Sequence, residues 1–266
     1  MLRSVGLKTL YDQRRALVAW GVSLVLLIAM YVAMWPSLRN QPSMRDFLNQ
    51  MPAAMRSLFA ASGADLSTAV GYVHVELLSI MGPLLLIIYS TNAGAGAIAG
   101  EEDRHTLDLL LSNPVSRTDL VLEKFGAMVA GTAALGTVTA VALLGQGRLV
   151  GMSLPAGGVV AAMLHMTLLA LVFGTMALAI GGATGHSALS RAVPAVIAVV
   201  SYIVNGLAPV VSWLEPLQRF SPFFQYAGHD PLRRGVSWAA VLVAVTTIVV
   251  LAGGAVAGFR RRDIAV

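Results

Sequence analysis

The densest group of ionisable side chains in this 266-residue chain is the run Glu101-Glu102-Asp103-Arg104-His105. Glutamates beside a histidine are typical of metal-dependent hydrolases, in which three ligands and a general base converge on one ion. No H-x-x-x-H or H-E-x-x-H motif accompanies the run, and the other four histidines are scattered along the sequence. We therefore predict no metal site and no catalytic residue, with an intramembrane hydrolase as the less favoured alternative.

A second stretch, from Gly131 through Gly136 to Thr137, has the glycine spacing of a phosphate-binding loop. It lacks the lysine that must reach the phosphates, and it lies inside an apolar segment. Close packing between helices is the better interpretation of these glycines, as it is for the Gly94-x-Gly96 pair. We predict no cofactor on this chain, so the ATP and Mg²⁺ for any active transport must be bound by a separate polypeptide.

Few polar side chains fall within the apolar segments. His165 and Glu76 are the main ionisable ones, and Asn92 and Asn205 add two amides. Such groups are costly in a bilayer and often mark a transport path, so we predict Asn92, His165 and Asn205 as substrate-path candidates. Hydrogen-bonded packing is the competing interpretation of each. This scarcity favours a transporter driven by an outside motor, with an ion-coupled secondary carrier as the alternative.

The composition places these residues in a membrane protein. Residues of the AVILMFWYC class make up 57% of the chain and charged residues only 12%, whereas soluble domains carry about 25% charged residues. There is no cysteine, which excludes disulfides, thiolate metal sites and cysteine nucleophiles. The excess of basic residues, +5 overall, is better explained by cytoplasmic loops than by nucleic-acid binding.

Six segments are long and apolar enough to cross a bilayer as helices of roughly 20 residues. We therefore predict an all-α polytopic membrane protein that forms a single transmembrane domain over residues 1–266. The predicted spans are residues 16–35, 75–99, 125–144, 159–181, 192–211 and 238–258.

An even number of spans places both termini on one side of the membrane. With that side cytoplasmic, most of the 18 basic residues lie inside, as the positive-inside rule requires. We predict a multi-pass protein of the bacterial inner (plasma) membrane with both termini in the cytoplasm. The predicted inner basic residues are Arg3, Lys8, Arg14, Arg15, Arg104, Arg117, Lys124, Arg191, Arg260, Arg261 and Arg262.

Short helices are expected between the spans. Residues 1–15 are too polar to insert and place Leu7 and Tyr11 on one helical face, which predicts a helix in the inner interface. An ordinary charged flank is the alternative there. Residues 213–237 contain aromatic residues interrupted by prolines, which predicts short broken helices that dip into the outer leaflet. A plain interfacial loop is equally compatible with that composition.

The segment most informative about function is residues 100–124, between the second and third predicted spans. Its acidic residues favour a helix N-terminus, and a proline at position 114 ends that helix. Ser116 or Thr118 can then cap the following helix. Three leucines at i, i+3 and i+4 form one face, which can lie on a lipid surface or fit a groove on a partner. These leucines are Leu107, Leu110 and Leu111.

The chain at this point resembles the ABC-2 type permeases, the membrane subunits of ABC transporters. The specific part is the run from Glu102 to Lys124, with Thr-Leu at 106–107, Pro at 114 and Ser-Arg at 116–117. Family members often have Gly-Thr where this chain has His105-Thr106. The resemblance implies a coupling helix seated in a cleft of the ATPase subunit. The implied ATPase-contact residues are Glu102, Thr106, Leu107, Leu110, Leu111, Pro114 and Arg117.

The resemblance also implies the partners and the activity. Two copies of an ABC ATPase subunit are expected to join two permease subunits, identical or related, in the lipid bilayer. The chain itself is then not an enzyme but the permease subunit of an ATP-driven exporter. An apolar cavity would suit a hydrophobic or amphipathic substrate, and the direction of transport follows from the resemblance alone.

Overall fold

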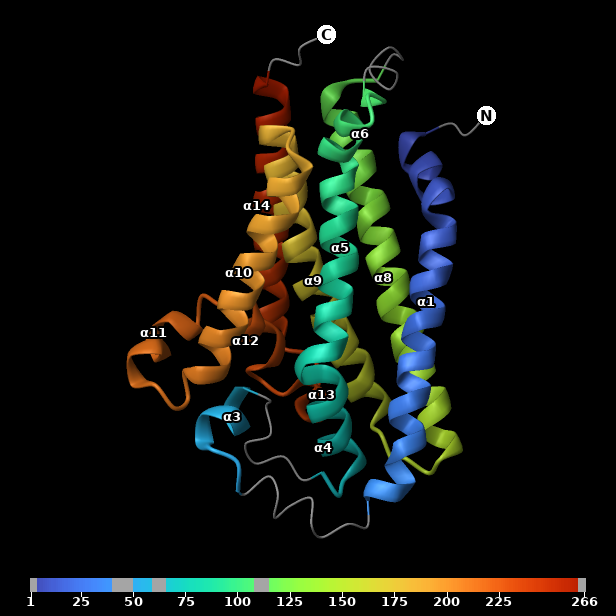
Figure 1. Ribbon diagram of the computed structural model, residues 1–266, viewed down its shortest axis with the longest axis vertical. Coiled ribbons are helices and arrows are strands. Elements are labelled where there is room, and N and C mark those ends of the chain that lie inside the picture. Colours follow the sequence, from blue (N-terminus) through green and yellow to red (C-terminus); the bar gives the residue numbers. More distant parts are fainter. Residues whose placement is uncertain (1–3, 40–49, 59–65, 108–114, 263–266) are drawn as a thin grey trace.

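Six long helices lie side by side in the computed structural model, which describes residues 4–39, 50–58, 66–107 and 115–262 (Figure 1). The fold is all-α, as predicted, and the described residues contain no strand. The six spans are α1 (Val5–Leu38), the segment Ala69–Ala97, α8 (Arg117–Leu149), α9 (Ala156–Thr184), α10 (Ser187–Leu207) and α14 (Trp238–Arg261). Each contains or overlaps one predicted span, and each is apolar enough to cross a bilayer.

Both chain ends lie at the same end of the bundle, which we call the terminal end (Figure 1). The short helix α6 (Ala99–Asp103) is also there, whereas α3 (Ala53–Leu58) and the loop helices after α10 lie at the far end. The common side of the two termini agrees with an even number of spans. Which side of a membrane the terminal end faces stays a prediction.

The first helix joins the predicted interfacial segment to the first span. α1 runs without a break from Val5 to Leu38, so residues 5–15 continue into the span as one helix. Their place in the inner interface stays a prediction. Ser4 caps this helix, with its Oγ accepting from the Leu7 backbone N–H at 3.1 Å. Hydropathy marks only the part of a helix that can cross hydrocarbon, and a good cap allows the helix to begin earlier.

The second span is divided into three consecutive helical segments. It begins as α4 (Ala69–Val73), widens into the π-helix η1 (His74–Met81) and continues as α5 (Gly82–Ala97). In the wide turn, the Gly82 N–H bonds to the Leu77 carbonyl, five residues back. Pro83 explains the change, since its ring has no N–H and collides with a carbonyl in a regular α-helix.

The fourth span, α9, is the centre of the bundle. It packs against α5, α8, α10 and α14, and 67% of its most apolar window is buried, compared with 17% for α1. Its contact with α5 is close because glycines face each other. A Cβ at Gly94 would lie 2.0 Å from the Gly174 carbonyl oxygen, and one at Gly174 would lie 2.1 Å from the Ser90 Oγ. The two helices can therefore approach this closely only with glycine at both positions.

The segment after α10 forms short, broken helices and not the plain loop that was the alternative prediction. These are η2 (Ser212–Leu214), α11 (Glu215–Gln218), α12 (Pro222–Ala227) and α13 (Pro231–Arg234). α12 packs between α9, α10 and α14, and its Tyr226 hydroxyl donates to the Leu78 carbonyl at 2.8 Å. Whether this segment enters the outer leaflet stays a prediction.

Candidate functional site

The segment that resembles a coupling helix begins at the terminal end, directly after α6. There the Glu101 carboxylate accepts a hydrogen bond from Lys124 Nζ of α8 at 2.5 Å and from Thr106 Oγ1 at 2.5 Å. The Lys124 side chain is 6% exposed and that of Glu101 19%, so this ion pair is largely shielded from solvent. It fixes the start of the segment to the third span.

Electrostatics keep Glu101 ionised in this position. Burial raises the pKa of its carboxyl, but the hydrogen bonds from Lys124 and Thr106 and the charge of Lys124 outweigh that effect. The net result is a pKa for Glu101 below its ordinary value. Glu101 is therefore ionised near neutral pH.

The far side of the segment is fixed by α8. Ser116 caps α8, with its Oγ accepting from the Asp119 N–H at 3.1 Å, which confirms one of the two predicted caps. Arg117 follows and donates from Nη1 to the Arg262 carbonyl at 2.7 Å, and its guanidinium lies over the Phe259 ring at 5.7 Å. Arg117 therefore ties the start of α8 to the end of α14.

Leu107 corrects the predicted leucine face. Its side chain is 2% exposed and packs in a core cluster with Ile98, Leu120 and Phe259. Leu107 is therefore an internal anchor at the base of the segment and has no free surface for an ATPase subunit. The i, i+3, i+4 pattern detects an apolar face but not which neighbour covers it.

The other predicted ATPase-contact residues divide into two groups. Glu102, Thr106 and Arg117 are half-buried and bonded within this chain, with Glu102 paired to Arg262 Nη2. The remaining three lie outside the described residues: Leu110, Leu111 and Pro114.

His105 occupies a backbone conformation that favours glycine. Its φ is 55°, and it lies two residues after the end of α6. A side chain in the left-handed region costs about 1 kcal/mol or more, although histidine tolerates it better than most. The turn after α6 therefore holds a histidine in a backbone conformation that favours glycine, at some cost in backbone strain.

We expect His105→Gly to stabilise the protein by about 0.5–1 kcal/mol, because relief of strain exceeds the added freedom of the unfolded chain. The midpoint of thermal unfolding in detergent measures this change. His186→Gly is the control, since exposed His186 has an ordinary φ of −101° and should lose stability. Equal effects of the two substitutions would contradict the strain at His105.

The predicted substrate-path residues line three different cavities. Asn92 lines one of about 310 Å³ between α5 and α10, and its Nδ2 donates to the Ile88 carbonyl at 2.9 Å. Asn205 lines one of about 400 Å³ at the far end, where its side-chain and backbone oxygens accept from Gln218. These two cavities share walls, namely Ser79, Tyr202 and Phe223.

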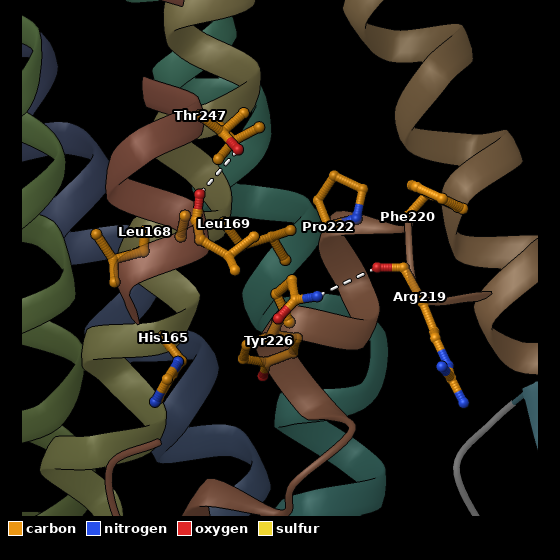
Figure 2. Close-up of a pocket in the computed structure, with 12 residues that line it drawn as sticks. His165, Leu168, Leu169, Arg219, Phe220, Pro222, Tyr226 and Thr247 are labelled. Atoms are coloured by element: carbon orange, nitrogen blue, oxygen red, sulfur yellow. Dashed lines mark hydrogen bonds between the residues drawn. The ribbon is translucent and has the colours of Figure 1, made fainter. Parts of the chain in front are cut away.

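His165 lines the third cavity, of about 230 Å³, shown in Figure 2. The histidine is 2% exposed, and its Nε2 accepts from the Ser237 N–H at 3.2 Å. His229 Nε2 lies 3.2 Å from the same atom, so it must donate for this contact to be a hydrogen bond. His165 thus joins α9 to the cap of α14, which favours the packing interpretation over a proton relay.

The comparison with protein families decides what this bundle is. Residues 4–264, nearly the whole chain, match the family described as ABC-2 family transporter protein. The chain belongs to the ABC-2 transporter family. No individually curated protein matches it. This ABC-2 protein is accordingly a multi-pass permease subunit of an ABC transporter, a family whose members work with ATPase subunits.

In this ABC-2 protein, Gly131 and Gly136, which have the spacing of a phosphate-binding loop, lie at contacts between helices. A Cβ at Gly131 would lie 2.2 Å from the Tyr89 hydroxyl, and one at Gly136 would lie 2.2 Å from Thr167 Oγ1. Gly96, by contrast, has open space around it. Among the described residues, no group of three or more His, Asp or Glu side chains is arranged to hold a metal ion.

Sequence reasoning missed two residues of the terminal end in this ABC-2 permease. Ser187 at the start of α10 donates to the Asp103 carboxylate, and Arg262 after α14 binds Glu102. In the sequence, Arg262 was only one of three consecutive arginines that we predicted to lie on the cytoplasmic side. No short-range pattern identifies either contact, because the partners lie 84 and 160 residues apart.

Proposed function

We propose that this chain is the permease half of an ATP-driven exporter for a hydrophobic or amphipathic substrate. Two permease subunits, identical or related, would join two ATPase subunits that bind ATP and Mg²⁺. Closure of the ATPases on ATP would push on the segment between α6 and α8, and the helices would rearrange to change access to a central path.

The observation that carries this proposal is the anchoring of that segment at both ends. On one side Leu107 is buried and Thr106 bonds to Glu101, and on the other Arg117 bonds to the end of α14. A segment held in this way at both ends would transfer a push to the bundle instead of absorbing it. The family match supports the same role.

The second permease subunit is proposed to cover α10. One face of this helix is exposed and apolar along most of its length, with Val193, Val196, Val200 and Ile203 in register. Arg191 lies near its start and lines the 310 Å³ cavity together with Asn92. A charged residue at such a position is better placed beside a protein partner or a wet path than in lipid. The substrate path would then follow α5 and α10.

The terminal end is proposed to face the cytoplasm of a bacterial cell. Arg260 and Arg261 end α14 there and Arg262 follows, and the positive-inside rule places such clusters on the cytoplasmic side. The ATPase subunits would bind at this end, where both chain ends and α6 lie (Figure 1).

We expect Leu110→Asp to leave the protein inserted in the membrane but to uncouple the partner's ATP hydrolysis from export. A charge in an apolar docking cleft is costly to desolvate, so contact with the ATPase should be lost. Purification in mild detergent measures whether the ATPase subunit stays bound, and the ATPase rate of the complex measures coupling.

Leu110→Met is the matched control, because it conserves volume and polarity and should keep the ATPase bound. Wild-type binding and coupling in Leu110→Asp would exclude this segment as the docking site. Transport by the permease alone in vesicles, driven by a proton gradient without nucleotide, would instead support the ion-coupled alternative.

A further inference from the structure

Three consecutive acidic residues of α6 contact three different parts of the bundle. They follow each other at about 100° around the helix axis, so Glu101, Glu102 and Asp103 point in different directions. We call these residues the acidic triad. None of the three contacts is between neighbours in sequence, as the shortest spans 23 residues. Each of these contacts therefore joins parts of the chain that are distant in the sequence.

The first link holds the third span. Lys124 Nζ lies 2.5 Å from Glu101 Oε1, and the neighbouring Glu123 accepts the Gly6 backbone N–H of α1 at 2.7 Å. Because α1 packs along α8, these contacts join α6, α8 and α1 at the terminal end. This part of the bundle is held as one unit.

The second link holds the fourth and sixth spans. Arg262 donates to Glu102 and also to the carbonyls of Gly181 and Gly182, near the end of α9, at 3.4 and 3.5 Å. Its side chain is 15% exposed, so the pair is partly shielded from solvent and salt. Arg262 follows α14 directly, and a displacement of Glu102 would therefore move the end of that helix.

The third link holds the fifth span. The Ser187 hydroxyl donates to Asp103 Oδ2, and Ser187 is the first residue of α10, 8% exposed. α10 also packs against α9 and α5, although only 22% of its most apolar window is buried. The hydrogen bond from Ser187 ties the first turn of α10 to α6.

We propose that the acidic triad distributes the motion of the coupling segment separately to the spans, through Ser187 to α10 and through Arg262 to α14. Glu102 and Asp103 are positioning residues in this scheme, and the inference rests on the proposed coupling to an ATPase. α6 suits the role because it connects directly to Thr106 and the anchored Leu107. A push on the segment then reaches two helices by two distinct contacts.

The test measures the two motions separately in the complete complex with its ATPase subunit. The chain has no cysteine, so nitroxide labels can be placed on exposed Met34→Cys in α1 with either Val210→Cys, directly after α10, or Leu242→Cys in α14. Labelled chain is diluted with unlabelled chain so that distances arise within one subunit. Each distance is measured without nucleotide and after trapping with Mg·ATP and vanadate.

Trapping is expected to shift both distances in the parent protein. Ser187→Ala should remove the α10 shift and keep the α14 shift. Arg262→Ala should keep the α10 shift and reduce the α14 shift, leaving the part that Arg117 carries through the backbone carbonyls of Phe259 and Arg262. Ser187→Thr, which keeps a hydroxyl, should restore the α10 shift. The matched acidic control at the terminal end is Asp12→Asn, because Asp12 is exposed, and it should keep both shifts.

The outcomes separate the inference from the proposed function. If the ATPase binds and traps nucleotide but both shifts keep their parent size in both variants, the triad does not transmit motion. Loss of both shifts in either single variant, or no shift in the parent, would also overturn separate transmission. If no ATPase binds the parent protein, the proposed function fails and the inference fails with it.

Discussion

Gly94→Ala is expected to destabilise the bundle by about 3 kcal/mol, because the new methyl group would meet backbone and not a movable side chain. The added Cβ would lie 2.0 Å from the Gly174 carbonyl oxygen and 3.2 Å from the Leu178 nitrogen. Relief requires α5 and α9 to move apart along their whole contact. The loss should appear as a lower unfolding midpoint and as aggregation in gel filtration.

Gly96→Ala provides the control for this prediction. Gly96 lies on the same helix two residues later, and a Cβ there would meet nothing within 4 Å. Both substitutions change the backbone freedom of the unfolded chain equally, so their difference isolates the helix contact. Equal stability of the two variants would show that α5 and α9 do not approach as described.

Lys124→Met is expected to lower the free energy of unfolding by about 3 kcal/mol. The Glu101 carboxylate would remain shielded from solvent but would lose the cation that pairs with it. The substitution keeps the length and apolar stem of the side chain, so the loss reports charge and hydrogen bonding. Unfolding in detergent measures the change, and the double variant Glu101→Leu with Lys124→Met should recover much of it.

Arg148→Met is the matched control, since Arg148 is exposed at the other end of the same helix. Loss of a solvated charge there should change stability by less than about 0.5 kcal/mol. A Lys124→Met variant as stable as Arg148→Met, or a double variant no better than the single one, would contradict the buried ion pair.

The spans were predictable because hydropathy over 20 residues depends only on local composition. Their ends were less so, as α1 shows, because caps and first turns extend a helix beyond its apolar part. Close packing between helices was predicted for both glycines of the Gly94-x-Gly96 pair, and it holds for only one of them. Gly94 is at a helix contact and Gly96 is not, which depends on the direction each one faces in the folded bundle.

The candidate site was predictable as a segment but not residue by residue. The sequence places Leu107, Leu110 and Leu111 on one face, yet Leu107 is covered by this chain's own helices. Likewise, the acidic run indicated a helix start but not its partners Lys124, Ser187 and Arg262. Such pairings arise from tertiary structure and leave no periodic signal.

The burial of α9 bears on how the protein enters its membrane. Its mean hydropathy of 2.0 equals or exceeds that of three more exposed spans, although its neighbours cover most of it. Lipid contact in the finished bundle does not explain this apolarity. During synthesis, however, α9 emerges before α10 and α14, so it must partition into the bilayer without them. Its residues therefore satisfy two successive environments, first hydrocarbon at insertion and later other helices.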